Sequence, residues 1–454
     1  MVQKINAKKK QNNHKKYHLY DAVTEILELY LNNNSSLKNL CFSTKYNLTP
    51  KALYALSVQV LKFKPVLVTI LHQCVPESFA GRSLRTCFLP PLYDLLFNNK
   101  INKADRANPG TKVAIKVITK RGDDLKEAFA KLKSERDLDE MIEPEIREKL
   151  DQASKVCKFL RANRSKFSRK RVIAALIKAG FKQVESIEEV FKSKKSFISD
   201  PIVSDIVICN PNAQLFDLDI VKEHKAVIQD RGSCLPVAAL DPPRGAFVVD
   251  FCAAPGNKSS HAAAQVGEEG TVVAVELDPS RFRTLRNRLI QLIASVQTIE
   301  DVSDETTSSL AVYNGSCLDY KNAEATHLII DPSCSSTGQL SSIDQILSSV
   351  ERDEENLEAL ADFQKSCVLH GMNPENYPLA ERIVYSTCSF HETENEDVVR
   401  HVLQISDENK WGWTLVTAMP DWPLRGINQP ETLRSGVETN CNGMFVAVFE
   451  KQNE

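Results

Sequence analysis

The sequence predicts an α/β protein built on a doubly wound, mostly parallel sheet. From residue 246 onward, short apolar runs rich in β-formers alternate with segments whose apolar residues recur at helical spacing. Such strand–helix alternation is typical of a parallel sheet with helices on both faces. A chain of 454 residues, 42% of them hydrophobic, is also long enough for two or three domains.

The elements of this sheet follow one another in order. The expected strands are AFVVDFC, TVVAVELD, LAVYNGS, THLIIDPS and ERIVYSTCS, and the expected helices are HAAAQVG, PSRFRTLRNRLIQLIASV, ERDEENLEALADFQKSCVL and ENEDVVRHVLQI. The final run, GMFVAVFEK, has no helix after it, as expected for an antiparallel edge strand. The polar piece 300–309 is an insertion to which we assign no function.

Three segments precede the doubly wound domain, which we place at 229–454. Residues 1–18 form a basic tail too polar to bury, suited to solubility, nuclear targeting or contact with RNA. Helical spacing predicts a helical N-terminal domain over 19–150. A small α+β domain is expected over 151–228, with KVCKFLRANRSK as a strand and RKRVIAALIKAGF as a helix.

Bulk composition argues against several classes of protein. The formal net charge is −2, from 57 basic and 59 acidic residues, so any surface for nucleic acid must be local. No apolar run approaches the roughly 20 residues that span a bilayer, and the basic N-terminus lacks the apolar stretch of a secretory signal. The twelve cysteines include no CxxC pair, which favours a reducing compartment. We therefore expect no membrane and no metal.

One basic cluster stands out near the start of the small domain. Basic side chains are unfavourable at a helix N-terminus unless an anion is present, so the cluster suggests a phosphate-binding surface. A solvated helix start explains it equally well. The cluster consists of Arg161, Arg164, Lys166, Arg169, Lys170 and Arg171.

The first strand of the doubly wound domain leads through a turn of small residues into a helix, from Asp250 to Lys258. Ligands of such sheets bind beyond the carboxyl ends of the strands. Small residues let the backbone approach a ligand closely, and amides at a helix start can meet a carboxylate. The turn has neither the GxGxxG pattern of dinucleotide enzymes nor that of a phosphate loop. Tight packing alone explains many turns of this kind.

The second strand ends in Glu276-Leu277-Asp278. An acid at this tip typically binds the two hydroxyls of a ribose. Asp278 precedes Pro279 and suits a helix N-cap, which leaves Glu276 for the ribose. The turn and the acid together indicate a nucleoside-type cofactor without identifying the reaction.

Two cysteines follow neighbouring strands of the sheet. The fourth strand ends in Asp331-Pro332-Ser333-Cys334, and the fifth ends in Tyr385-Ser386-Thr387-Cys388-Ser389. Most cysteines are inert, buried, small hydrophobic residues. Parallel strands deliver their ends to one edge, however, so two cysteines there, one preceded by an acid, indicate a reactive pair.

Together these motifs resemble the Nol/Nop/Sun family of RNA cytosine-5 methyltransferases. The resemblance runs from about residue 156 to the C-terminus and rests on FCAAPGNKSSH, QDRGSCLP, Glu276, DPSCSSTG and YSTCS followed by ENEDVV. The helical region and basic tail are most similar to the branch that acts on large-subunit (28S/25S) ribosomal RNA. The resemblance implies a Rossmann-like class I fold, S-adenosylmethionine as cofactor, and a nucleolar monomer acting on RNA, either large-subunit ribosomal RNA or the pre-ribosome.

The resemblance also implies roles for individual residues. Cys388 would add to C6 of cytosine, converting the ring to an enamine whose C5 attacks the methyl donor, and Cys334 would assist release of the product. Asp331 would hydrogen-bond the base at N3, and Lys258 would position the base and hold the thiolate form. S-adenosylmethionine would contact Cys252, Ala253, Ala254, Pro255, Gly256, Asn257, Lys258, Glu276 and Asp331. The basic cluster of the small domain, rather than the resemblance, predicts that RNA contacts Arg161, Arg164, Lys166 and Arg169.

The chain departs from the family pattern after the third strand. Many relatives have an acid there that binds the adenine amino group, whereas this chain reads Asn314-Gly315-Ser316-Cys317. Ser316 could substitute with a weaker hydrogen bond, but we do not assign it that role.

Three other functions compete with this interpretation. Enzymes that methylate exocyclic amines have an Asp/Asn-Pro-Pro-aromatic turn, and Asp331-Pro332-Ser333-Cys334 lacks the second proline and the aromatic. A catalytically silent, RNA-binding assembly factor is disfavoured because all four candidate catalytic residues are present. DNA enzymes of this chemistry attack with the fourth-strand cysteine and need no second thiol.

Overall fold

The computed structural model describes residues 17–32, 36–75, 82–293, 295–301, 306, 308–347 and 354–452. The chain forms two compact units. The first comprises the described part of 1–150 together with 342–347, and the second comprises 151–341 and the described part of 350–454. The predicted basic tail lies almost entirely outside the described residues, as does part of the insertion at 300–309.

The first unit contains only helices among its described residues. The Tyr20 hydroxyl donates to Asp94 Oδ2 at 2.7 Å inside its core, and a short helix that follows Cys334 in sequence belongs to this unit. No single described helix is long and apolar enough to cross a membrane, although α3 and α4, bent by 70°, pass that test as a pair. The helices are α1 Leu19–Leu31, α2 Leu37–Cys41, α3 Pro50–Lys62, α4 Lys64–Cys74, α5 Arg82–Asn98, α6 Pro109–Lys120, α7 Gly122–Glu135 and α15 Ile343–Leu347; α8, Pro144–Lys155, runs from this unit into the second.

The second unit begins with the small α+β domain. Its five-stranded sheet has the order β2-β3-β4-β1-β5, and every neighbouring pair is antiparallel except β2 with β3. The predicted strand and helix are present as β1 and α9. The elements are β1 Lys158–Ala162, α9 Arg169–Lys178, β2 Lys182–Gln183, α10 Ile187–Lys192, β3 Ser196–Ser199, β4 Ile206–Cys209, α11 Asp219–Lys222 and β5 Ala226–Ile228.

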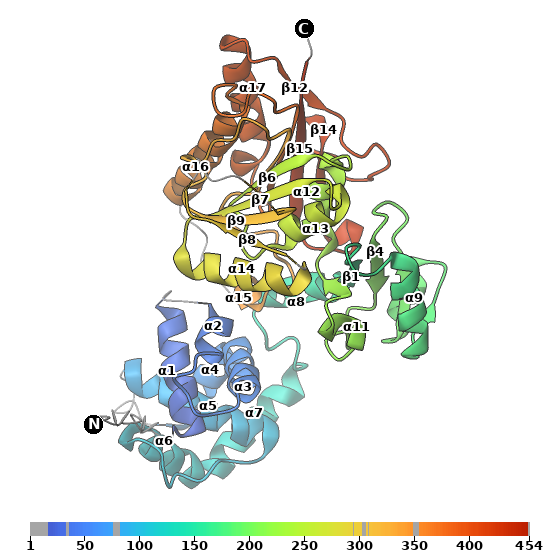
Figure 1. Ribbon diagram of the computed structural model, residues 1–454. Helices are drawn as coiled ribbons and strands as arrows, with labels where there is room; N and C mark the ends of the chain where they lie inside the picture. The colour runs from blue at the N-terminus through green and yellow to red at the C-terminus, as the bar shows by residue number, and fades with distance from the viewer. Residues whose placement is uncertain are drawn as a thin grey trace, which may run out of the picture. The chain divides into compact units, whose positions relative to one another are not determined.

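The doubly wound sheet forms the rest of the second unit (Figure 1). Its strand order is β13-β14-β15-β11-β10-β6-β7-β9-β8, with β12 also paired to β15. The strands from β11 to β8 are parallel, and the sequence predicts all of them except the short β8, Gln297–Ile299. The elements are α12 Arg231–Leu240, β6 Phe247–Phe251, α13 Asn257–Val266, β7 Thr271–Glu276, α14 Pro279–Leu292, β8 Gln297–Ile299, β9 Leu310–Asn314, β10 His327–Ile330, α16 Glu354–Met372, β11 Arg382–Thr387, η2 Glu392–Glu394, α17 Glu396–Glu408, β12 Trp413–Val416, β13 Arg425–Gly426, β14 Gln429–Ser435, η3 Val437–Thr439 and β15 Met444–Lys451.

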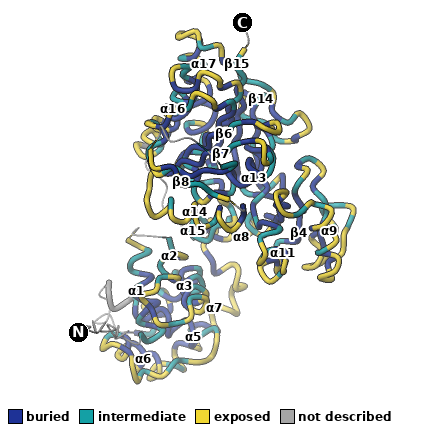
Figure 2. Tube along the Cα trace, in the orientation of Figure 1, coloured by how far each residue is buried: buried dark blue, intermediate teal, exposed yellow. Residues whose placement is uncertain are grey.

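Helices cover both faces of this sheet, and Figure 2 shows β6 and β7 as buried. Successive strand residues point to opposite faces. Val248 therefore packs with α12, α13 and α14, whereas the next residue, Val249, packs with α16 and α17. The strands need apolar residues at nearly every position because both faces are buried.

The last strand differs from the sequence-based expectation. β15 is antiparallel to β11, as predicted, but it is not an edge strand. It also pairs with β14 and β12, which come from the stretch 413–435. The sequence predicts no strand there, because this stretch lacks the uninterrupted apolar runs of the parallel strands.

The strand order places a topological switch point at the centre of the sheet. β6 lies between β10 and β7, so the connections that leave its two neighbours run to opposite sides. Such a switch point is where ligands bind in open α/β sheets. The segments that follow β6, β7, β10 and β11 converge at this edge.

Candidate active site

The turn after β6 has a backbone shape that glycine makes possible. Gly256 has φ +97°, and a Cβ there would lie 3.0 Å from the Leu285 and Leu289 side chains of α14. The turn therefore packs closely on α14 while the start of α13 remains at the sheet edge. Directly before the turn, Asp250 is fully buried and accepts from Ser259 Oγ at 2.6 Å. Burial raises the pKa of Asp250 to about 7.

Glu276 joins the tip of β7 to this turn. Its carboxylate accepts from the backbone N–H of Ala254 at 3.3 Å and from that of Asp278 at 3.0 Å. Arg281 lies 3.6 Å from the same carboxylate. Asp278 caps α14 by accepting from the backbone N–H groups of Ser280 and Arg281, as predicted. Of the two acids, Glu276 is therefore the one held against the turn.

The segment after β9 is organised without an acid. The Asn314 side chain donates to the backbone carbonyl of Glu276 at 2.8 Å, which ties β9 to the end of β7. Ser316 Oγ accepts from the backbone N–H of Leu318 at 3.1 Å and so stabilises a turn. Cys317 Sγ lies 4.0 Å from Cys252 Sγ and 3.8 Å from Cys367 Sγ.

The two predicted reactive cysteines meet at the ends of β10 and β11. Their Sγ atoms lie 3.3 Å apart. Ser336 Oγ and Gln339 Nε2 each lie 3.5 Å from Cys388 Sγ. The hydrogen bond with Cys334, followed by those with Ser336 and Gln339, lowers the pKa of Cys388 to about 6, whereas the same bond raises the pKa of Cys334. The shared hydrogen bond therefore favours the thiolate form on Cys388 and the thiol form on Cys334.

An ion pair stands beside the two thiols. Lys258 Nζ donates to Asp331 Oδ2 at 2.6 Å, and Ser386 Oγ donates to Asp331 Oδ1 at 2.7 Å. Burial alone would lower the pKa of Lys258, but Asp331 outweighs it and the pKa is raised. Both oxygens of the Asp331 carboxylate accept hydrogen bonds, and their remaining lone pairs can accept another from the exocyclic amino group of a cytosine. A hydrogen bond to a negatively charged ring nitrogen needs a donor, which Lys258 provides.

The residues that sequence analysis missed lie around the cysteines. Ser386 precedes Cys388 by two residues, so an extended chain places both side chains on the same face. Strand periodicity could therefore have identified Ser386 as a site residue. Ser336 and Gln339 follow β10 in a loop, and no sequence signal places them. Gly338 in that loop donates to the backbone carbonyl of Cys388 at 2.8 Å. A Cβ at Gly338 would lie 2.8 Å from the carbonyl oxygen of Gly443, so this close approach requires glycine.

The predicted RNA-binding residues do not form one surface. Arg161 is fully buried and donates to Gln229 Oε1 at 2.8 Å and Ser260 Oγ at 2.9 Å. Burial lowers the pKa of Arg161 to about 10. A guanidinium with no exposed surface cannot reach a phosphate, so its assignment as an RNA contact was wrong. Arg161 instead joins β1 to α13.

The other three basic side chains reach acceptors within the protein. Arg164 lies 3.4 Å from Asp205 Oδ2, Lys166 donates to the carbonyl of Gln291 at 2.7 Å, and Arg169 donates to the carbonyl of Asp200 at 3.3 Å. Lys166 and Arg164 remain exposed, and Arg169 is partly exposed. These three residues keep enough exposure to meet a polyanion.

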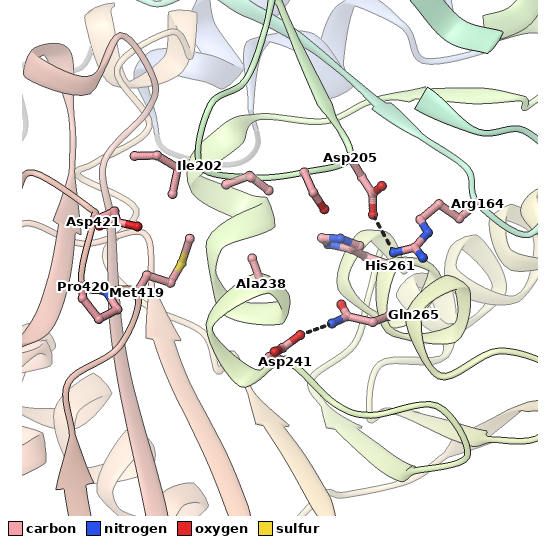
Figure 3. A pocket seen from close by; sticks show the side chains of 12 residues that line it. Arg164, Ile202, Asp205, Ala238, Asp241, His261, Gln265, Met419, Pro420 and Asp421 are labelled. Atoms are coloured by element: carbon pink, nitrogen blue, oxygen red, sulfur yellow. Dashed lines mark hydrogen bonds and ion pairs between the residues drawn. The ribbon is translucent and has the colours of Figure 1, made fainter. Parts of the chain in front are cut away.

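Arg164 also lines a pocket of about 330 Å³ in the second unit (Figure 3). Three carboxylates also line the pocket, those of Asp205, Asp241 and Asp421. His261 lines it too, and burial followed by Arg161 and Arg164 lowers the pKa of that imidazole. Three carboxylates outweigh one guanidinium beside a neutral imidazole, so this pocket disfavours a phosphate.

The fold and this site define a Rossmann-like methyltransferase with two thiols at its catalytic edge. Residues 237–450 match the family described as 16S rRNA methyltransferase RsmB/F. The chain is 30% identical over 446 residues to a mouse 28S rRNA (cytosine-C(5))-methyltransferase, covering 95% of this chain and 91% of that protein. It is 31% identical over 414 residues to the Schizosaccharomyces pombe 25S rRNA (cytosine-C(5))-methyltransferase rcm1, covering 90% and 84% of the two chains.

Solved structures share the fold. A methyltransferase homologue from Pyrococcus horikoshii aligns with TM-score 0.52 at 18% identity, covering 86% of this chain and 99% of its own. NSun6 from the same organism aligns with TM-score 0.50 at 16% identity, covering 68% and 94%. The chain belongs to the family of rRNA (cytosine-C5) methyltransferases, and it is an enzyme that acts on RNA.

Proposed function

We propose that this enzyme transfers a methyl group from S-adenosylmethionine to C5 of a cytosine in large-subunit ribosomal RNA. The observation that carries the proposal is the pair of Cys334 and Cys388, whose sulfurs are 3.3 Å apart beside the Lys258–Asp331 ion pair. Relatives that match nearly the whole chain are named for 28S and 25S ribosomal RNA. We further propose that it works as a monomer in the nucleolus, on ribosomal RNA or the pre-ribosome.

The residues at the switch point fit S-adenosylmethionine. The turn Cys252–Lys258 offers small side chains and the start of α13, and Glu276 stands over it with a carboxylate suited to ribose hydroxyls. S-adenosylmethionine supplies a methyl group on a positively charged sulfur. The residues that would bind S-adenosylmethionine are Cys252, Ala253, Ala254, Pro255, Gly256, Asn257, Lys258, Glu276 and Asp331.

Cys388 starts the reaction. Its thiolate forms a bond to C6 of the cytosine, and the displaced electron pair moves into the ring towards N3 and makes C5 nucleophilic. Lys258 donates a hydrogen bond towards N3, and Asp331 accepts one from the exocyclic amino group. The Lys258 hydrogen bond stabilises the negative charge that develops in the ring, and the Asp331 hydrogen bond orients the base.

Cys334 completes the reaction. Its hydrogen bond to the Cys388 thiolate raises its pKa, and that bond and charge disappear while Cys388 is bonded to carbon. Cys334 can then lose its proton to solvent and take the proton from C5. The C5–C6 double bond re-forms, the C6–S bond breaks, and Cys388 leaves as a thiolate. The cycle returns to one thiolate beside one thiol.

Bisulfite sequencing of ribosomal RNA tests the proposal in cells with and without the gene. We expect one large-subunit cytosine to lose its methyl group in the deletion strain and to regain it with the wild-type chain. A Cys388→Ala chain, expressed at the same level, should not restore it. Unchanged methylation of all large-subunit cytosines would reject the substrate, and restoration by Cys388→Ala would reject the nucleophile.

A further inference from the structure

Two consecutive residues, Glu394 and Asn395, lie behind the thiol pair. Glu394 ends the short helix η2, and Asn395 precedes α17. Both side chains are fully buried, and each contacts the backbone or side chain of residues next to a different cysteine. Neither residue touches a thiol directly among the contacts of the described chain. Their contacts therefore concern the placement of the thiols rather than their chemistry.

Glu394 holds the peptide on one side of Cys334. Its Oε1 accepts from the backbone N–H of Ser335 at 2.9 Å and from Gln364 Nε2 at 2.9 Å. Gln364 Nε2 also donates to the backbone carbonyl of Ser333 at 3.0 Å. The residues before and after Cys334 are therefore both bonded to the Glu394–Gln364 pair.

Asn395 holds the residues on both sides of Cys388. Its Oδ1 accepts from Thr387 Oγ1 at 2.5 Å, and its Nδ2 donates to the backbone carbonyl of Ser389 at 2.9 Å. One side chain thus spans the strand end that presents Cys388.

The two cysteines depend on these contacts to different degrees. Thr387, next to Cys388, still pairs with Phe445 of β15, so the sheet itself restrains that strand. β10 ends at Ile330, four residues before Cys334. Cys334 lies in a loop without ladder hydrogen bonds, so its position rests more heavily on Glu394 and Gln364.

The stability of the fold does not explain why residue 394 carries a carboxyl group. The side chain is 0% exposed, its Oε2 has no hydrogen-bond partner, and within the described residues it forms no ion pair. A buried carboxyl group with an oxygen that has no hydrogen-bond partner is costly compared with an apolar group of the same shape. By contrast, Glu396, two residues on, is buried against Arg434 at 2.5 Å.

We propose that Glu394 and Asn395 are positioning residues that divide the two half-reactions between them. Glu394, through Gln364, Ser333 and Ser335, holds Cys334 for release of the product. Asn395, through Thr387 and Ser389, holds Cys388 for attack. This inference rests on the proposed roles of the two thiols.

Covalent adduct formation on a cytosine-containing ribosomal RNA fragment, with S-adenosylmethionine, separates the two roles. Glu394→Ala should methylate once and then remain attached to RNA as a band stable on a denaturing gel, as expected for Cys334→Ala, with turnover reduced about 100-fold. Asn395→Ala should form adduct slowly and accumulate none. Glu394→Gln, which keeps one acceptor oxygen, should retain more turnover than Glu394→Ala.

A structural role would not produce this contrast. Glu396→Ala is the matched control, because it removes a buried carboxylate and should lower stability without trapping RNA. If Glu394→Ala does not fold, Gln364→Ala removes a neutral side chain from the same contact and should trap adduct. Folded Glu394→Ala and Gln364→Ala proteins that accumulate no adduct, beside a Cys334→Ala protein that does, would overturn the inference alone. No adduct with Cys334→Ala would overturn the proposed thiol roles and this inference with them.

Discussion

The carboxylate of Glu276 accepts a hydrogen bond from the backbone N–H of Ala254 at 3.3 Å, and this contact links the tip of β7 to the turn after β6. Both segments lie at the switch point of the sheet, where a ribose and an amino-acid chain of one cofactor can be bound together. The side chain is only 4% exposed, so it is already oriented before a ligand arrives.

Glu276→Ala should therefore weaken donor binding. A hydrogen bond to a charged group is worth about 1.5–3 kcal/mol, which corresponds to a dissociation constant for S-adenosylmethionine raised about 10- to 100-fold. Isothermal titration calorimetry measures this directly. Asp278→Ala is the control: it removes the N-cap of α14, so it should cost about 1 kcal/mol of stability and leave donor affinity nearly unchanged. Weaker binding by Asp278→Ala, with unchanged binding by Glu276→Ala, would show that Asp278 binds the ribose instead.

Much of the fold could be predicted because the parallel strands are buried on both faces. Continuous apolar runs such as the one around Val248 and Val249 can hardly be placed elsewhere. The strands at 413–435 were missed because β13 and β14 are interrupted by polar residues. β14 is paired with β15, and β13 is paired with β14, so both strands depend on tertiary pairing rather than on a strand pattern of their own. That omission also made β15 look like an edge strand.

The thiol site was predictable and its surroundings were not. Cys334 and Cys388 follow adjacent parallel strands, so topology alone brings them together. Glu394 and Ser336 reach the site through tertiary loop contacts that no periodicity reveals. The prediction that Arg161 contacts RNA was wrong for a different reason. Arg161 shares a face of β1 with buried Phe159, but the sequence does not reveal that another element covers that face.

Salt dependence tests the remaining basic residues of the small domain. On single-stranded RNA each phosphate contact contributes a log–log slope of roughly −0.7, so replacing Arg164, Lys166 and Arg169 together should flatten the slope by about 2. Fluorescence anisotropy over a range of salt concentrations gives that slope. Donor affinity should not change, because none of the three contacts the donor turn.

A second triple variant controls for net charge. Lys365, Arg400 and Lys410 lie on or next to α16 and α17, so their replacement removes the same charge and should leave the slope almost unchanged. Equal effects of the two triple variants would mean that the basic cluster is only a solvated helix start. Arg161→Met should lower thermal stability without altering the slope, because Arg161 is buried.

The pH dependence of adduct formation follows from the lowered pKa of Cys388. Only the thiolate attacks, so the rate should rise with pH through about 6 and level off above it, instead of rising near 9. Ser336→Ala removes one of the contacts that lower this pKa, so its inflection should move to higher pH. Single-turnover adduct formation across pH, followed on denaturing gels, measures both. A wild-type inflection near 9 would show that the thiol is not activated.

The division of labour between the two thiols gives the last prediction. Addition to C6 and methyl transfer precede release, so the two alanine variants should stop at different steps. Cys388→Ala cannot form the adduct and should have no activity. Cys334→Ala should add and methylate once, then remain covalently bound to its RNA as a shifted band under denaturing conditions. The 3.3 Å separation of the sulfurs allows either one to reach the same carbon, so the assignment needs this experiment. Exchanged roles would trap the Cys388→Ala protein instead, and full activity without trapping in both variants would reject the thiol mechanism.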